Sequence, residues 1–146
     1  MRKFLTGRWE LLAGAFLLMS GLVGCGGRQE APDPASQGMT VEVDFHTVHR
    51  CSRLSPAILV GNVPKGTSYF DVRLVEMEPV ERLLGGGIWS NDGSGKIAEG
   101  GLTRLYSGPC PPRGKERRYS YVISAMPFGG GQPLSVRTAE VLVEGE

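Results

Sequence analysis

The chain has 146 residues, which suits one domain with an appendage and leaves no room for two full-sized cores. Hydrophobic residues make up 40% of it and charged residues 21%, the composition of a folded protein, while 22 Gly and 10 Pro favour turns over long helices. The formal net charge is only +1, so the chain lacks the excess of Lys and Arg that neutralises phosphates, and we expect no nucleic-acid partner.

Residues 1–24 have the organisation of an export signal. Arg2, Lys3 and Arg8 form a basic start, and a mostly apolar stretch follows over residues 11–23. That stretch is shorter than the roughly 20 residues that cross the hydrocarbon core of a bilayer. We therefore predict a signal peptide that is cleaved, in preference to a permanent transmembrane anchor.

The end of this signal, Leu22-Val23-Gly24-Cys25, resembles the bacterial lipobox. The resemblance implies that Cys25 carries a diacylglyceryl group and becomes the first residue of a lipoprotein. Several acyl chains on one residue anchor a protein durably, so the expected location is the cell envelope, with a membrane as the first partner. By the same resemblance, Gly26 after the cysteine favours the outer membrane if the cell is Gram-negative. Residues 25–38 then form a flexible tether, because residues 26–38 carry no large apolar side chain.

Two cysteines remain once Cys25 is assigned to the lipid. Cys51 and Cys110 are an even pair in an oxidising compartment, which favours a disulfide between them. The bond would close a loop of about 60 residues and stabilise the fold by about 4 kcal/mol in the chain-entropy model. The alternative is two unpaired buried thiols, since a sequence does not give the distance between their Cα atoms.

Residues 39–146 are predicted to form a single β-rich domain. Alternating apolar residues, or short runs rich in β-formers, predict strands within residues 39–48, 57–60, 68–75, 117–126 and 135–144. No segment sustains the helical period, and we expect only one short helical turn near residues 80–84. The predicted fold class is therefore all-β with minimal helix content.

The candidate motifs for chemistry lack the spacing or the context that each requires. The glycine-rich residues 90–97 miss two positions of a phosphate-binding loop. On a strand, His46 would face away from His49 and Cys51, so these side chains are not expected to share a metal ion. A surface histidine beside a disulfide cysteine is the simpler interpretation. Since no nucleophile lies beside a recognisable base, we predict no enzyme activity, no metal and no cofactor.

Four blocks of the sequence occur in the order seen in one protein family. They are Cys51-Ser52-Arg53-Leu54-Ser55-Pro56, Val63-Pro64-Lys65-Gly66-Thr67, Tyr106-Ser107-Gly108-Pro109-Cys110-Pro111-Pro112 and Arg117-Arg118-Tyr119. Over about residues 45–144 the chain resembles phosphatidylethanolamine-binding proteins, specifically the bacterial branch called Raf-kinase-inhibitor-like. The resemblance implies a central antiparallel sheet packed on a smaller sheet, and a small surface pocket for anionic groups such as phosphate.

The same resemblance places the ligand pocket between residues 76–79 and the loop of residues 108–118. The ligand-binding residues it implies are Glu76, Glu78, Pro79, Gly108, Pro109, Pro111, Arg113 and Arg117. The sequence departs from the family at several of these places. Glutamates replace the expected aspartates, Leu84 stands where a histidine is expected, and Glu116-Arg117 replaces the usual His-Arg. Residues 128–133 also replace the helix that commonly precedes the family's last strand.

Two functions remain open on the sequence alone. The first is a cell-envelope lipoprotein that binds a small anionic or lipid-headgroup ligand in a preformed pocket, without catalysis. The second is a structural or interaction lipoprotein that has lost the pocket and binds another envelope protein, which the loss of both histidines favours. Convergence of Glu76, Glu78, Arg113 and Arg117 on one concave site would distinguish the first from the second.

Overall fold

The computed structural model describes residues 38–146, so the expected signal peptide, Cys25 and all of the expected tether except Gly38 lie outside the described residues. No helix in the described part is long and apolar enough to cross a membrane. The elements in chain order are β1 (Thr40–Asp44), the 3₁₀-helix η2 (Thr47–His49), β2 (Ala57–Gly61), β3 (Thr67–Glu76), β4 (Arg82–Ser90), β5 (Lys96–Ile97), β6 (Glu116–Pro127) and β7 (Ser135–Glu144).

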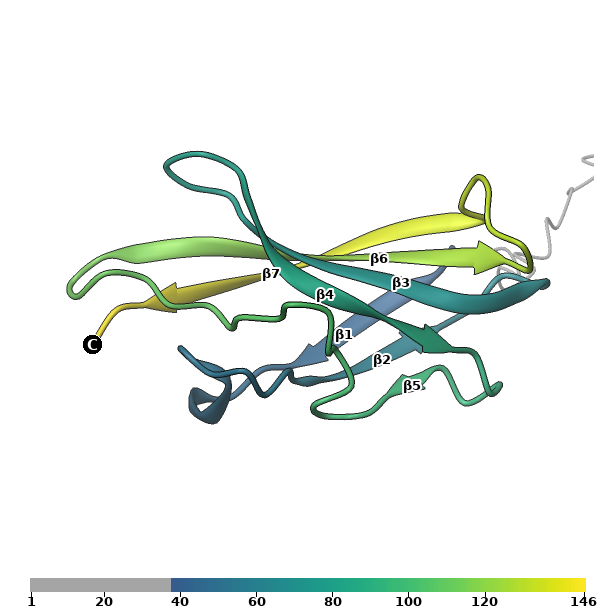
Figure 1. Cartoon of the computed structure of the whole chain (residues 1–146), viewed down its shortest axis with the longest axis horizontal. Coiled ribbons are helices and arrows are strands. Elements are labelled where there is room, and N and C mark those ends of the chain that lie inside the picture. The colour runs from purple at the N-terminus through teal and green to yellow at the C-terminus, as the bar shows by residue number, and fades with distance from the viewer. Residues whose placement is uncertain (1–37) are drawn as a thin grey trace, which may run out of the picture. The chain divides into compact units, whose positions relative to one another are not determined.

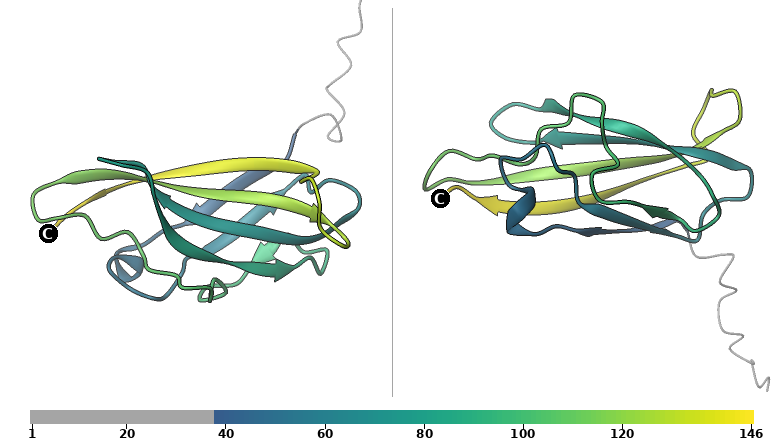
Figure 2. Two further views of the ribbon diagram at one scale, coloured as in Figure 1. Left: turned by 45° about the horizontal axis from the view of Figure 1, so that its top comes forward. Right: turned by 60° about the horizontal axis from the view of Figure 1, so that its bottom comes forward.

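The strands form two antiparallel sheets arranged as two layers (Figures 1 and 2). The larger sheet has the order β4-β3-β6-β7, and the smaller sheet has the order β1-β2-β5. The core between them is built from Met39, Ile58, Val60, Phe70, Val72, Leu74, Ile97, Leu102, Tyr106, Tyr119, Tyr121, Ile123, Ala125 and Val143. The structure therefore confirms the predicted all-β class, with a larger sheet packed on a smaller one. Residues 38–146 contain their own hydrophobic core, as expected of a domain that folds by itself.

Apolar side chains of one parity on β3 and β6 form the centre of the larger sheet. Phe70, Val72 and Leu74 of β3 are buried, and so are Tyr121 and its neighbours of the same parity on β6. The hydroxyl of Tyr121 lies 2.9 Å from that of Tyr106, so two buried polar groups satisfy each other. Burial raises the pKa of both phenols, and they remain neutral at physiological pH.

Three predicted elements differ from the structure. The segment near residues 80–84 is a turn followed by β4, where we expected a helical turn, because Gly85–Gly87 interrupt the apolar alternation of that strand. The strand expected over residues 39–48 ends at Asp44, and η2 follows it. The strand β5 has only two residues, which is too short for an alternation of apolar residues to be recognised in the sequence. The expected loss of a helix before the last strand is confirmed, since residues 128–134 simply connect β6 to β7.

The two histidines lie in a bend: His46 is exposed, in agreement with the predicted surface histidine, whereas His49 is buried. His49 is 1% exposed, and its Nε2 lies 2.8 Å from Oε1 of Glu99. Its Nδ1 accepts the backbone N–H of His46 at 2.8 Å. Because η2 interrupts the extended backbone, the two rings lie 5.8 Å apart instead of on opposite faces of a strand. His49 thus joins η2 to the segment after β5, a structural role.

Three consecutive glycines bring a loop against the free edge of β4. Gly86 exchanges two backbone hydrogen bonds with Arg104, at 3.0 and 2.8 Å, and Ser107 N–H donates to the carbonyl of Leu84 at 2.9 Å. A Cβ on Gly85, whose φ is +104°, would collide with the carbonyl of Leu105. Glycine at this position is therefore required by a close backbone approach. Residues 104–107 protect an edge that would otherwise present unpaired backbone groups.

Candidate functional site

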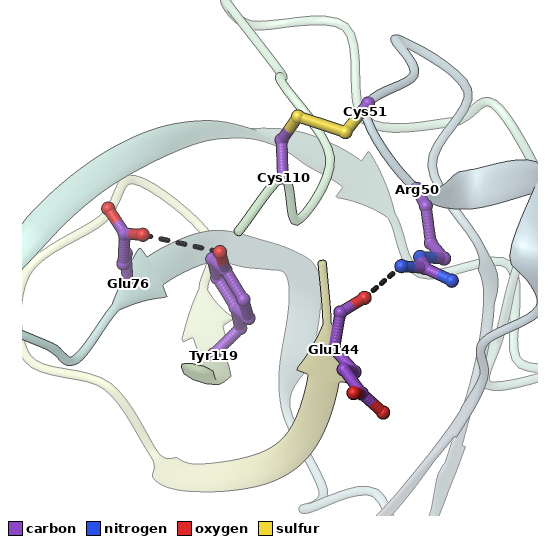
Figure 3. Close-up of a disulfide and its surroundings, with 6 residues drawn as sticks. All are labelled: Arg50, Cys51, Glu76, Cys110, Tyr119 and Glu144. Carbon is purple, nitrogen blue, oxygen red and sulfur yellow. Dashed lines mark hydrogen bonds between the residues drawn. A yellow bond between two sulfur atoms is a disulfide. The ribbon is translucent and has the colours of Figure 1, made fainter. Parts of the chain in front are cut away.

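A buried carboxylate lies at the end of β3. Glu76 is 3% exposed, and its Oε2 accepts a hydrogen bond from Nη2 of Arg82 at 2.7 Å. Its Oε1 accepts from Nη1 of Arg117 at 2.8 Å. The Tyr119 hydroxyl also donates to Oε1, at 3.2 Å (Figure 3). We call Glu76, Arg82, Arg117 and Tyr119 the Glu76 cluster. With the acidic and basic groups ionised, the cluster holds two positive charges against one negative charge.

Strand pairing alone brings these four side chains together. Glu76 is opposite Arg82 in the β3–β4 ladder and opposite Tyr119 in the β3–β6 ladder. Arg117 precedes Tyr119 by two residues on β6 and so faces the same side of the sheet. The site is thus built on rigid strands, which hold its groups more firmly than a loop would.

The surroundings fix the ionisation state of the cluster. Burial alone would raise the pKa of Glu76, but hydrogen bonds from Arg117, Arg82 and Tyr119, together with the charge of Arg82, lower that pKa below its ordinary value. Burial, followed by the nearby negative charge of Glu76, raises the pKa of Tyr119 to about 12. At physiological pH Glu76 is therefore an anion that only accepts hydrogen bonds, and Tyr119 is a neutral donor.

The other ligand-binding residues implied by the family resemblance lie outside the Glu76 cluster. Glu78 and Pro79 are exposed in the turn between β3 and β4. Arg113 is exposed, and its backbone forms a bridge near the C-terminal end. Pro111 is buried and lines a separate cavity of about 240 Å³ beside the last residues of the chain. The four charged residues of the predicted pocket therefore do not all converge: Glu76 and Arg117 meet, whereas Glu78 and Arg113 do not join them in the described part.

The predicted disulfide is confirmed and lies beside this cluster. Cys51 and Cys110 are bonded, with their Cα atoms 4.5 Å apart (Figure 3). Both cysteines are exposed, which contradicts the alternative of buried free thiols. The backbone of Cys110 acts to lower the pKa of Tyr119, so the disulfide fixes a loop that lies next to the Glu76 cluster.

Gly108 and Pro109 are buried and fasten the loop before β6 to the segment after η2. The N–H of Gly108 donates to the carbonyl of Ser52 at 2.7 Å. The N–H of Cys51 donates to the carbonyl of Pro109 at 2.9 Å. A Cβ on Gly108 would collide with the carbonyl of His49. The Gly-Pro-Cys-Pro-Pro block, the most specific part of the family resemblance, therefore has a structural task. A ligand-binding role for these two residues stays a prediction.

The sequence analysis missed three arginines that line a cavity of about 630 Å³, namely Arg73, Arg82 and Arg104. The same cavity is lined by Gly85–Gly87 and by Leu105. Arg82 was not predicted because its pairing with Glu76 depends on β4. That strand contains Gly85–Gly87, which interrupt the apolar alternation by which a strand is recognised in a sequence. A run of three glycines can indicate a close backbone approach, and it was the available signal for this part of the molecule.

The comparisons with known proteins bear on the fold. No family model matches the chain, and no curated protein matches its sequence. Among solved structures, the crystal structure of E. coli YbcL, described as a new member of the mammalian PEBP family, aligns with a TM-score of 0.55 and 14% identity. The alignment covers 75% of this chain and 100% of YbcL. Together with the two packed antiparallel sheets, this similarity shows that residues 38–146 have the fold of the phosphatidylethanolamine-binding (PEBP) family.

Proposed function

We propose that the protein is a cell-envelope lipoprotein whose β domain binds a small anionic ligand, such as a phosphate or a lipid headgroup, without catalysis. The observation that supports this function is the Glu76 cluster. One buried carboxylate holds two guanidinium groups from different strands, which leaves a net positive charge at the surface. A fixed guanidinium is a planar fork of donors that suits phosphate and carboxylate.

The hydrogen bonds of the cluster leave part of each arginine for a ligand. Arg82 is 66% exposed and donates to Glu76 through Nε and Nη2, so Nη1 makes no hydrogen bond within residues 38–146. Arg117 donates through Nη1 and is 23% exposed. Because Glu76 already orients both guanidiniums, an anion would bind with little further loss of side-chain freedom.

A thermal-shift titration of residues 26–146 with phosphate, phosphoethanolamine and phosphoserine tests this site. A ligand that binds only the folded state raises the unfolding temperature in a saturable way, and we expect that rise. Arg82→Gln should reduce it strongly. Arg118→Gln is the matched control. Arg118 is on the same strand as Arg117, but it is 51% exposed and its distance to Glu140, 3.8 Å, is long for an ion pair. Absence of a shift at millimolar ligand, or equal shifts in wild type and Arg82→Gln, would exclude the proposed site.

The lipid anchor is the second component of the proposal and depends on Cys25. Labelled palmitate should be incorporated into the wild-type protein in bacterial cells and lost in Cys25→Ser. The double variant Cys51→Ser, Cys110→Ser is the control, since it leaves Cys25 as the only thiol of the chain and should keep the label. Equal labelling of wild type and Cys25→Ser would show that the lipobox is not used.

A second function is favoured by the completeness of the contacts around Glu76. Both carboxylate oxygens are satisfied by donors of the chain itself, as expected of a cluster that only stabilises the fold. The domain would then act as an interaction lipoprotein that contacts another envelope protein. A titration with no thermal shift would favour this alternative.

A further inference from the structure

The larger sheet has one covered edge and one open edge. Residues 104–107 cover the β4 edge, whereas β7 ends the sheet on the other side (Figure 2). β1 of the smaller sheet lies close to β7, but no backbone hydrogen bond joins these two strands within residues 38–146. The outer side of β7 therefore presents a row of backbone donors and acceptors that pair with no other strand of the described chain. Such a row is a template for a further strand.

The pairing of β7 with β6 determines which backbone groups face outward. The N–H of Gly145 donates to the carbonyl of Lys115 at 2.8 Å, so Gly145 and the odd-numbered residues before it bond to β6. The residues that direct their N–H and C=O groups outward are the even-numbered ones, Val136, Thr138, Glu140, Leu142 and Glu144. A side-chain nitrogen of Arg50 already donates to the carbonyl of Glu144, which occupies that end of the row. The open stretch is therefore residues 136–142.

The open stretch carries two exposed apolar side chains. Val136 is 44% exposed and Leu142 is 61% exposed. Both are on the solvent-facing side of the sheet, because the odd-numbered Val141 and Val143 pack against the core. Ala139 lies halfway between the two exposed residues along the strand. A two-fold axis at Ala139 would thus bring the valine of one strand to the leucine of another.

We propose that β7 pairs antiparallel with β7 of a second copy of the chain, with Ala139 at the two-fold axis. In this register Val136 of each copy lies opposite Leu142 of the other, and Thr138 lies opposite Glu140. The outward backbone groups of these four residues then meet in hydrogen-bonded pairs. The apolar pairs cover the exposed side chains, and the threonine hydroxyl can donate to the carboxylate. Two four-stranded sheets become one continuous sheet.

The neighbouring registers match less well. The outward groups of both strands face each other only when the register moves by two residues at a time. One such shift places Glu140 opposite Glu140 of the other copy, where like charges destabilise the pair. The shift in the other direction places Val136 opposite Glu140, an apolar side chain against a charge. Side-chain complementarity therefore selects the register centred on Ala139.

The inference goes beyond the proposed function, since neither the Glu76 cluster nor Cys25 takes part in the contact. A single strand pair is a small interface, so we expect a weak and reversible dimer. Anchoring through Cys25 would concentrate the chain on a membrane and favour the dimer by raising its effective concentration. The contact itself should form in solution without an anchor and without an anion.

Sedimentation equilibrium of residues 26–146, from micromolar to millimolar concentration, tests the inference. The wild type should shift from monomer to dimer as its concentration rises. Val136→Lys and Leu142→Glu should each raise the dissociation constant about tenfold, since each change disturbs two symmetry-related pairs. The variant with both changes should dimerise about as well as the wild type, because the lysine of one copy then lies opposite the glutamate of the other.

Ile88→Lys is the matched control for these variants. Ile88 is 48% exposed and lies opposite Asp71 at the β4 edge of the same sheet, so its replacement should leave the dissociation constant unchanged. A wild type that stays monomeric up to millimolar concentration would overturn the inference. Equal weakening by Ile88→Lys would do the same, and so would a double variant that dimerises no better than the single ones.

Oxidative cross-linking checks the centre of the register. Ala139→Cys should give a disulfide-linked dimer, because the introduced thiols face each other in a non-hydrogen-bonded pair whose Cα atoms are about 4.5 Å apart. Val141→Cys is the control, since in this register it lies opposite Arg137 and away from its own counterpart. Residues 26–146 hold no other free thiol, as Cys51 and Cys110 are bonded. Equal cross-linking of both variants, or none of Ala139→Cys, would overturn the proposed pairing.

Discussion

Replacing both Cys51 and Cys110 with serine is expected to lower the free energy of unfolding by about 4 kcal/mol. The two cysteines are 59 residues apart, so their bond removes a large loop-closure entropy from the unfolded chain. For a domain of about 110 residues this loss is a large part of the total stability, which is usually about 5–15 kcal/mol. Urea denaturation of residues 26–146, followed by tryptophan fluorescence, measures the change.

Reduction of the wild-type protein supplies the control for this experiment. Dithiothreitol should destabilise the wild type by a similar amount and leave the double serine variant unchanged, because that variant has no disulfide to reduce. A loss below about 1 kcal/mol would contradict the entropic account. It would mean that the hydrogen bonds Gly108–Ser52 and Cys51–Pro109 already hold the two segments together without the sulfur bridge.

The strands that could be predicted are those with a regular alternation of apolar residues. The β7 boundaries agree with the predicted residues 135–144, and those of β6 differ by one residue at each end. β4 was missed because Gly85–Gly87 have no side chains with which to show a period. These glycines are required by the backbone of residues 104–107, a contact that depends on tertiary structure and leaves no local pattern.

The site could be predicted only in part, for a related reason. The family resemblance identified Glu76 and Arg117, and β3–β6 pairing joins them. Arg82 was not identified, because its contact with Glu76 requires the register of β3 against β4. Conversely, Gly108 and Pro109 belong to the block that carries the resemblance, yet in this structure their contacts are with the backbone around the disulfide. Sequence blocks shared with a family can therefore preserve its framework while the residues at its pocket change.

The Glu76→Gln variant is expected to lose about 3 kcal/mol of stability at pH 7, since it leaves two guanidiniums without their shared partner. This loss of stability is at the lower end of the range of about 3–5 kcal/mol for breaking a buried ion pair, because Arg82 is largely exposed to solvent. The effect should depend on pH. The pKa of Glu76 is lowered in the folded state, so its contribution is fully present above the ordinary value of 4.5 and disappears as pH falls through the lowered pKa. Wild type and variant should therefore converge in acid.

Urea denaturation of both proteins at several pH values between 7 and 3 measures this convergence. Glu140→Gln is the matched control, because Glu140 is 57% exposed and its nearest guanidinium nitrogen is 3.8 Å away, so its loss should change stability by less than about 0.5 kcal/mol. A difference between wild type and Glu76→Gln that stays constant down to pH 3 would show that the charge of Glu76 does not stabilise the fold. Glu76 would then act by shape and hydrogen bonding alone, and the two arginines would be positioned by their strands without the carboxylate.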